Sequence, residues 1–308
     1  MEGGGGADAL VASVIDIGSN SVLLLTLGVA ADGRARQRDA LLATTRLGAG
    51  LVEGGALEPA ACARTREAVV AQVEHARRHG TSRCWAFSTG AARRASDGRA
   101  FAAELARAAT CPVEVLSGDD EAALAHAAVA HALVTGDQRV LAVDVGGATT
   151  ELTLGRGDRV EESVSLALGA LALTERGAGA VAEVECVLAA TPLAARAAGA
   201  AVLASGGTAT ALAALDLGLA TYDPARVHGH TLAVARLDAL CRQARTLPGV
   251  LDEGRARILP AGAAILAGVA RVAGSETLRV SEHGVRHGYL RRRLALEGVE
   301  ADLRALWG

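Results

Sequence analysis

Two short stretches of this sequence combine an aspartate with a turn of small residues. Residues 16–21 read DIGSNS, and residues 144–152 read DVGGATTEL. Each stretch follows one apolar run and precedes another, so we expect each to connect two β-strands. Successive backbone N–H groups in such a turn can point at one anion, and glycine permits close approach. The two stretches therefore predict phosphate-binding turns, although glycines also shape hairpins that bind nothing.

Acidic residues beside these turns favour a metal ion. A carboxylate at the end of an apolar strand loses hydration unless it gains a partner, and a metal that bridges to phosphate is one such partner. Asp144 and Glu151 flank the second turn. We expect them to hold Mg²⁺ directly or through water, with Mn²⁺ as the alternative cation.

A third turn, SGGTAT at 205–210, follows a predicted strand and opens a predicted helix. A helix N-terminus attracts phosphate, so Gly206, Gly207 and Thr208 are candidate phosphate ligands. The first two turns are neither Walker loops nor dinucleotide fingerprints, because a strand and not a helix follows their glycines.

Two further segments supply candidate reactive side chains. In LSGDDEAALAHAAV at 116–129, Ser117 is a predicted helix N-cap, and the acids that follow either stabilise the helix dipole or include a general base, Glu121. In STGAARRA at 88–95, Arg93 either grips phosphate oxygens or is a solvated surface charge.

These residues need a scaffold, and the hydrophobic periodicity predicts an α/β one. Its elements in the first half are strands at 10–17, 21–29, about 35–46, 83–87 and 112–116, and helices at about 58–79, 97–109 and 118–134. The second half begins the same way, with strands at 138–144, 150–155, 158–166 and 200–204 and a helix at 207–218.

The repeated order favours two copies of one α/β domain. We place the first domain at 8–136 and the second at 137–283, with a last helix at about 284–306 that packs back on the first.

Composition limits the partners and the location. The 308 residues are 51% hydrophobic and carry a net charge of −3, so no general basic field attracts nucleic acid or a membrane surface. The five cysteines are widely spaced without a CxxC pair, which favours the reducing cytoplasm. The start, MEGGGGADAL, lacks the pattern of a signal peptide. Charged residues interrupt the apolar stretch at 256–274, so we expect a core element there.

Several motifs together resemble one known family. In chain order they are DIGSNS, STGAARRA, SGDDEA, DVGGATTEL, SLALGALALTE, SGGTATALAAL, YDPARVHGH and VSEHGVRHGYL. This set, from about residue 12 to 294, resembles the Ppx/GppA family of exopolyphosphatases and guanosine pentaphosphate phosphohydrolases. The resemblance implies two RNase H-like domains of the actin and sugar-kinase superfamily around a central cleft, and a short form without the C-terminal helical extension.

The resemblance also implies roles for single residues. Glu121 matches the catalytic glutamate, Arg93 a phosphate-contacting arginine, and Asp144 with Glu151 the acidic pair used with Mg²⁺. The residues that match the two phosphate loops are Asp16, Gly18, Ser19, Asn20, Gly146, Gly147 and Thr149. The sequence departs from the family at Ala148 and Thr149, where glycine and serine are usual, at Ala123, where an arginine is common, and at Asp119 and Asp120, which replace glutamates.

Three functions remain open from the sequence. The first is a Mg²⁺-dependent phosphohydrolase that releases terminal orthophosphate from short polyphosphate or from guanosine pentaphosphate. The second is a sensor that binds guanosine penta- or tetraphosphate and hydrolyses little, and the third is a kinase-like ATPase of the same superfamily. Whether the protein is a homodimer is also left open.

Two polar pairs near the end of the chain are weaker candidates for a functional site. His228 and His230 have no evident carboxylate partner at metal spacing, so we expect a polar loop and no metal site. Glu282 and Arg286 are four residues apart, which predicts an exposed pair on a helix.

Overall fold

The computed structural model of the protein describes residues 8–177, 183–244, 251, 253–304 and 306. They form two compact units, of which the second is Ala122–Gly288 and the first comprises the rest of the chain. The division falls inside helix α4 (Gly118–Leu133). The domain limits expected from the sequence, near 136 and 283, stay predictions. Residues 1–7, where the sequence predicts no signal peptide, and residue 305 of the last expected segment lie outside the described residues.

The first unit is built on a five-stranded sheet with the order β3-β2-β1-β4-β5. The first three strands are antiparallel neighbours, whereas β4 and β5 run parallel to β1. Its elements are β1 (Leu10–Ile17), β2 (Ser21–Val29), β3 (Ala35–Thr44), α1 (Pro59–Arg78), β4 (Arg83–Ser88), α2 (Gly90–Arg94), α3 (Gly98–Ala109), β5 (Val113–Val115) and most of α13 (Val285–Leu296).

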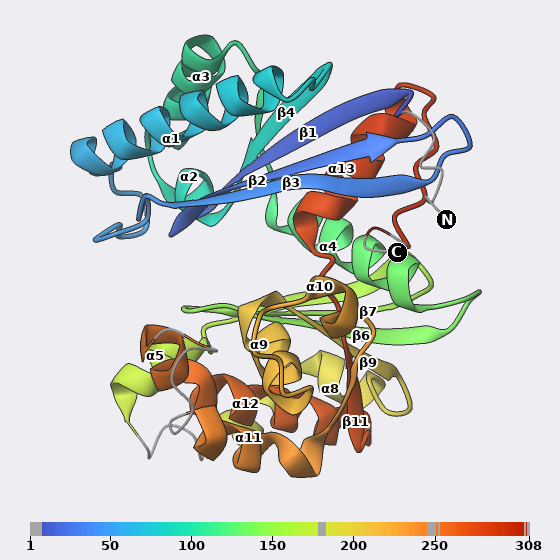
Figure 1. The fold of residues 1–308 in the computed structure, drawn as a ribbon. Helices are drawn as coiled ribbons and strands as arrows, with labels where there is room; N and C mark the ends of the chain where they lie inside the picture. Colours follow the sequence, from blue (N-terminus) through green and yellow to red (C-terminus); the bar gives the residue numbers. More distant parts are fainter. Residues whose placement is uncertain (1–7, 178–182, 245–250, 252, 305, 307–308) are drawn as a thin grey trace. The chain divides into compact units, whose positions relative to one another are not determined.

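Helices cover both faces of this sheet (Figure 1). Alternate residues of a strand point to opposite sides, and apolar residues on both sides pack against these helices. Ile15 and Ala86 belong to one apolar core with residues of α1 and α3. Phe87 faces the other way, and its ring lies 4.7 Å from that of Tyr289 on α13. The parallel strands therefore end between two helical layers, and their carboxyl ends can present side chains at one edge of the sheet.

The second unit repeats this plan. Its sheet has the order β10-β11-β9-β6-β7-β8, so β8-β7-β6-β9-β11 corresponds to the five strands of the first sheet. Its elements after α4 are β6 (Arg139–Val145), β7 (Thr150–Arg156), β8 (Arg159–Leu166), α5 (Ala170–Arg176), α7 (Glu183–Ala189), α8 (Pro192–Arg196), β9 (Ala201–Ser205), α9 (Gly206–Asp216), α10 (Pro224–Val227), β10 (Thr231–Ala233), a 3₁₀ turn (Val234–Arg236), α11 (Leu237–Ala244), α12 (Glu253–Ala273) and β11 (Thr277–Val280).

The second sheet is also covered on both faces. Leu141 and Val143 of β6 pack into the large core that includes α9 and α12, whereas Val140 and Ala142 face residues of α4. Among the described residues, α12 is the helix long and apolar enough to span a membrane by length and composition, but 56% of its apolar window is buried within the protein. Because its residues belong to the core of the second unit, α12 is a core helix, as expected for 256–274.

The duplicated α/β architecture expected from the sequence is confirmed. The predicted strands and helices up to residue 166 are present, with ends shifted by no more than two residues. Among the described elements that were not expected are the short ones α2, α10, β10 and β11. All five cysteines are free thiols.

Candidate functional site

The first predicted phosphate turn connects β1 and β2 and is held by the backbone around it. Asp16 lies one residue before the end of β1 and is buried. The Gly18 N–H, in the turn itself, donates to the Ser21 carbonyl at 2.9 Å. A methyl group at Gly18 would stand only 3.2 Å from that carbonyl oxygen. The position therefore favours glycine because the turn is tight, even without a positive φ.

A neighbouring loop fixes the far side of this turn. The N–H groups of Thr45 and Arg46 donate to the Asn20 carbonyl at 3.0 and 2.9 Å, and the Gly48 N–H donates to the Ser19 carbonyl at 2.8 Å. Because both carbonyl groups are occupied by backbone donors, the Ser19 and Asn20 segment has little freedom to change shape. The turn is thus preorganised by hydrogen bonds that need no ligand.

Arg93 and Glu121 meet in the same unit. β4 lies beside β1, where Ser88 pairs with Ile17, and α2 then carries Arg93. The Arg93 guanidinium donates through Nη1 to Glu121 Oε2 at 2.8 Å and to the Leu116 carbonyl at 3.2 Å. The two side chains are 36% and 28% exposed, so a ligand can reach both. A methyl group at Gly90, the first residue of α2, would stand 3.4 Å from Ser19 Oγ, which brings this helix next to the first turn.

The start of α4 shows how Glu121 is positioned. The Asp120 N–H donates to Ser117 Oγ at 3.0 Å, and Ser117 Oγ donates to Asp120 Oδ2 at 2.7 Å. The N-cap expected at Ser117 is therefore present, with a reciprocal bond that resembles a capping box. Asp120 therefore has a structural role at the cap, whereas Glu121 contacts Arg93.

The second turn repeats the geometry of the first. Gly146 N–H donates to the Thr149 carbonyl at 2.9 Å, and a methyl group at Gly146 would stand 3.1 Å from that oxygen. The carbonyls of Gly146 and Gly147 accept from the first N–H groups of α5, at Ala170, Leu171 and Ala172. The N-terminus of α5 is thereby used to hold the turn.

The departure at Ala148 leaves the second turn unstrained, and Gly169 packs closely against the backbone of that turn. Ala148 is exposed, and positive φ among described non-glycine residues is confined to Arg46 and Thr110. A methyl group at Gly169, however, would come within 2.4 Å of the backbone of Gly147 and Ala148. The second turn therefore accepts alanine at 148 without backbone strain, and the close approach is made possible by glycine at 169.

Asp144 and Glu151 lie directly opposite each other across β6 and β7. Directly opposed residues of an antiparallel pair project on the same face of the sheet. Ser205 Oγ donates to Asp144 Oδ2 at 3.3 Å, and Ser165 Oγ donates to Glu151 Oε1 at 3.0 Å. Two carboxylates supported by hydroxyl groups form the all-oxygen donor set that suits Mg²⁺, so the residues present fit that cation.

The third turn joins β9 to α9 beside Asp144. Gly206 has φ +82°, and a methyl group there would lie 2.3 Å from Asp144 Oδ1. A methyl group at Gly207 would lie 3.6 Å from Cζ of Arg255, an arginine near the start of α12. Thr208 is buried. The third turn thus has glycines at the two positions that Asp144 and the Arg255 guanidinium approach. Arg255 is therefore a candidate phosphate contact, one that the sequence did not predict.

Glu282 corrects one expectation. It follows β11 and precedes α13, so it is not part of an exposed helix pair with Arg286. The Tyr222 hydroxyl donates a hydrogen bond to Glu282 Oε1. Burial raises the pKa of Glu282, while the Tyr222 bond and the charge of Arg286 lower it. Since β6, β9 and β11 are parallel, Asp144, Ser205 and Glu282 lie at the carboxyl ends of three neighbouring strands, where α/β sheets commonly bind ligands.

The histidines of the VHGH segment also differ from expectation. His230 does have a carboxylate partner, since its Nε2 lies 2.8 Å from Asp216 Oδ2. His228 caps α10 and stacks on the ring of His283, with centroids 4.7 Å apart. The segment is the expected loop, between α10 and β10, but its histidines contact residues from distant parts of the chain, and one of these is a carboxylate.

The structure thus assembles the predicted residues in two groups. In the first unit, the first turn, Arg93 and Glu121 adjoin one another. In the second, Asp144, Glu151 and the turns at Gly146 and Gly206 do so. Arg255 was missed because it comes near the site from a distant segment and belongs to no recognisable motif. Tyr222 opens the YDPARVHGH motif, but its contact with Glu282 cannot be predicted from that motif alone.

Comparison with known proteins places this arrangement in a family. The model of the Ppx/GppA phosphatase family matches residues 40–297. The chain belongs to the Ppx/GppA phosphatase family. The solved Aquifex aeolicus family member is 27% identical to this chain, with a TM-score of 0.81 over 94% of this chain and 98% of that one. A second structure of an Aquifex aeolicus Ppx/GppA phosphatase is also 27% identical, with a TM-score of 0.79 over 91% and 98%.

An exopolyphosphatase from Cytophaga hutchinsonii is 20% identical, with a TM-score of 0.79 over 94% of this chain and 98% of that one, and shows the fold alone. The two units are RNase H-like α/β domains, as the resemblance implied. Membership in the Ppx/GppA family makes the chain a hydrolase of the phosphatase type.

Proposed function

We propose that this protein is a Mg²⁺-dependent phosphohydrolase that releases terminal orthophosphate from inorganic polyphosphate of short chain length, from guanosine pentaphosphate, or from both. The observation that carries the proposal is the contact between Arg93 and Glu121 beside the first turn, at 2.8 Å. A guanidinium can bind phosphate oxygens, and a carboxylate next to it can accept a proton from water. Family membership supports the reaction class.

The proposed division of roles follows from the donors present. Backbone N–H groups of the first turn, together with Arg93, bind the terminal phosphoryl group, and the N–H groups of the turns in the second unit are candidate phosphate contacts of their own. Glu121 orients a water molecule and takes its proton as the water oxygen forms a bond to phosphorus. The anhydride bond to the rest of the chain breaks in the same displacement, and the shortened chain leaves with the bond's electron pair.

Asp144 and Glu151 would hold Mg²⁺, because they are the opposed carboxylates of the second unit. When bound, the ion supplies compensation for the negative charge of the phosphate chain. Ser205 and Ser165 support the two carboxylates through their hydroxyl groups and so keep their oxygens on one face of the sheet.

The test is orthophosphate release by the purified protein in the presence and absence of Mg²⁺. Glu121→Gln should lower kcat by about 10²- to 10⁴-fold, because the amide cannot accept the proton from water. Asp119→Asn is the matched control, since it removes an exposed carboxylate from the same first helical turn. Turnover that survives in Glu121→Gln, with the control unchanged, would refute the role of Glu121 as base.

Substrate choice needs parallel assays of short polyphosphate, long polyphosphate and guanosine pentaphosphate. We expect faster release from the short chain or the nucleotide than from the long polymer. Tight binding of guanosine penta- or tetraphosphate by calorimetry, with no release at high protein concentration, would replace the hydrolase with the sensor. Reversion of Ala123 to arginine and of Ala148 to glycine would then show whether these departures cause the loss of turnover.

A further inference from the structure

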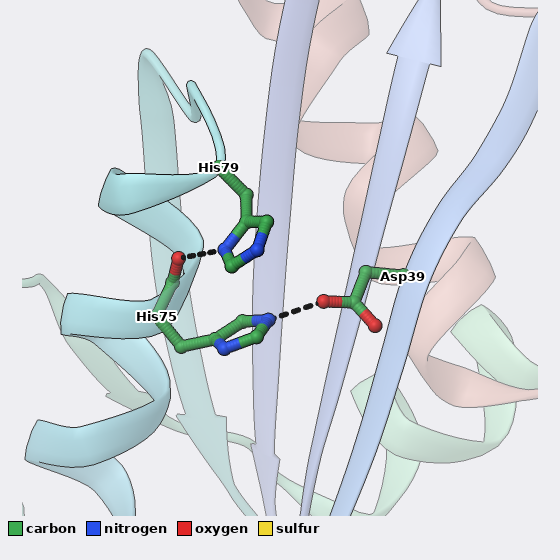
Figure 2. Close-up of side chains that lie close together, drawn as sticks. All are labelled: Asp39, His75 and His79. Carbon is green, nitrogen blue, oxygen red and sulfur yellow. Dashed lines mark hydrogen bonds and ion pairs between the residues drawn. The ribbon is translucent and has the colours of Figure 1, made fainter.

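Three side chains that play no part in the proposed reaction converge near the edge of the first sheet. Asp39 lies on β3, and His75 and His79 lie at the C-terminal end of α1, as Figure 2 shows. One ligand atom from each lies within 4.8 Å of the other two. His75 Nε2 is in hydrogen-bond contact with Asp39 Oδ2. Two imidazoles and a carboxylate within this distance are a common donor set for a transition metal.

The positions of the three residues on β3 and α1 bring their side chains together. Asp39 and Leu41 are two apart on β3, so both project on the same face, and Leu41 packs against the core that contains α1 residues. His75 and His79 are four residues apart, so they occupy one side of the helix. Their rings stack with centroids 4.0 Å apart. The meeting therefore follows from the register of the strand and the helix.

Hydrogen bonding prepares His79 to be a ligand. Its Nδ1 lies 2.8 Å from the backbone carbonyl of His75. A carbonyl oxygen can only accept, so Nδ1 carries the proton, and Nε2 of the neutral ring keeps its lone pair. A second-shell bond of this kind, from the non-ligating nitrogen to a carbonyl, is typical of histidines that bind metals.

The local charge also suits a cation. The C-terminal end of a helix carries a partial negative charge, and Asp39 adds a full one. Arg77 lies in the same turn, but its guanidinium is engaged elsewhere, donating to the Thr110 carbonyl at 2.9 Å. Arg78 is exposed on the helix. The negative charge of Asp39 and of the helix end is therefore not offset by Arg77, whose guanidinium is bound at Thr110.

We propose that Asp39, His75 and His79 bind one Zn²⁺ ion or a similar divalent transition metal. The donors favour this class over Mg²⁺ or Ca²⁺, which prefer oxygen ligands. Zinc lies about 2.0 to 2.2 Å from such atoms, so two ligands can be at most about 4.4 Å apart. Small side-chain rotations bring the cluster within that limit. His75 would exchange its contact with Asp39 for a bond to the ion, and water would complete the coordination.

The ion would join β3, which is an edge strand, to the end of α1. Asp39 pairs with Thr26, whereas the residue of β3 that pairs beside the first turn is Thr44. Five residues along a strand correspond to about 17 Å. The metal would therefore stabilise the first unit without contacting the first turn.

The experiment is calorimetric titration of the full-length protein with Zn²⁺, in excess Mg²⁺ so that oxygen-rich sites are already occupied. We expect one tight site per chain. Asp39→Asn and His79→Gln should each weaken Zn²⁺ binding by about tenfold or more, because even the loss of a residue that only supports a metal ligand typically lowers metal affinity by about 10- to 100-fold. Glu74→Gln is the matched control, because Glu74 is an exposed acid on the same turn of α1 and is not one of the three clustered residues.

Two outcomes would overturn the proposal. One is the absence of tight binding to the folded parent protein. The other is binding of equal strength in Asp39→Asn and His79→Gln, which would assign the ion to other histidines or cysteines. Circular dichroism of each variant without metal checks that the fold is retained. Co²⁺ in place of Zn²⁺ gives a second readout, since its visible absorption should change in the two ligand variants and not in the control.

Discussion

Arg93 and Glu121 are residues whose individual interpretation was ambiguous in the sequence. An arginine of an Arg-Arg pair is commonly a surface charge, and an acid in the first turn of a helix commonly stabilises the dipole. Their contact at 2.8 Å, with Arg93 also bonded to the Leu116 carbonyl, shows that the two are positioned together. The guanidinium has further donors for phosphate, because only Nη1 is used in these two bonds.

Arg93→Met should therefore affect both binding and turnover. It removes a charge-assisted contact of about 1.5 to 3 kcal/mol, so we expect kcat/KM to fall by about 10- to 100-fold. KM should rise, because phosphate is gripped less well, and kcat should fall because Glu121 is no longer held. Steady-state kinetics on the best substrate measure both.

Arg94→Met is the control for this prediction. Arg94 has the same charge, but its guanidinium donates to the Gly90 carbonyl of its own helix. An equal loss in both variants would show that general positive charge, and not the contact of Arg93, matters.

How much of the site could be predicted depends on whether a residue belongs to a local motif. Asp144, Glu151 and Gly146 surround one turn, so the sequence alone could place them together. Arg255 approaches from a segment that is distant in the chain, and no local pattern marks it. Tyr222 belongs to the YDPARVHGH motif, but its partner Glu282 lies 60 residues later in the chain. The spacing of His75 and His79 within a predicted helix was a usable signal, but Asp39 became their neighbour only through the pairing of β3 with the rest of the sheet.

At the scale of elements, the limit of prediction is length. Strands β1 and β2 have eight and nine residues with long apolar runs, so their positions were clear. α2 has five residues and β10 has three, which is too short for a periodic pattern. Such elements form because their neighbours supply the partners, as β11 does for β10.

The segments α10, β11 and α13 bring three histidines together in the second unit. The rings of His228 and His287 both stack on His283, with centroids 4.7 and 4.4 Å away. Burial is the largest cause that lowers the pKa of each, to about 4 for His228 and to about 3 for His283. The pKa of His287 is also well below its ordinary value. The stack is therefore neutral in the folded state.

This stack predicts that acid destabilises the second unit. The unfolded histidines bind protons near their ordinary pKa of about 6.5, whereas the folded ones do so only near pH 4 or below. Their contribution to stability is complete above pH 6.5 and is lost as the pH falls below it. Each histidine should lower the free energy of unfolding by about 1.4 kcal/mol per pH unit in this window.

Urea unfolding followed by circular dichroism at a series of pH values measures this slope. His283→Asn removes one titrating ring from the middle of the stack and should make the slope shallower by the amount expected for one histidine. A slope that is unchanged in the variant, or stability that does not depend on pH between neutrality and pH 5, would contradict the prediction.

At the scale of the whole molecule, duplication explains why the two turns look alike. In each unit, a glycine N–H at the end of the first antiparallel strand donates to a carbonyl three residues later, at 2.9 Å. The strand order around the turn is also the same in both sheets. The side chains to which we assign roles in the proposed reaction, by contrast, are divided: Arg93 and Glu121 belong to one unit, and the opposed acids Asp144 and Glu151 to the other.

If the likeness of the two turns reflects a shared chemistry, each turn contributes to phosphate binding, and a glycine substitution in each turn can test this. Gly18→Ala and Gly146→Ala place equivalent methyl groups 3.2 and 3.1 Å from a carbonyl oxygen, so each should distort its turn slightly and raise KM. Gly284→Ala is the control, because a methyl group there meets nothing within 4 Å. We expect Gly18→Ala and Gly146→Ala each to lower kcat/KM by several-fold, because a distorted turn presents its N–H groups less well to phosphate, whereas Gly284→Ala should leave kcat/KM unchanged. Steady-state kinetics of the three variants measure this. An unchanged kcat/KM in Gly146→Ala would mean that the second turn only closes its hairpin and is a structural relic of the duplication.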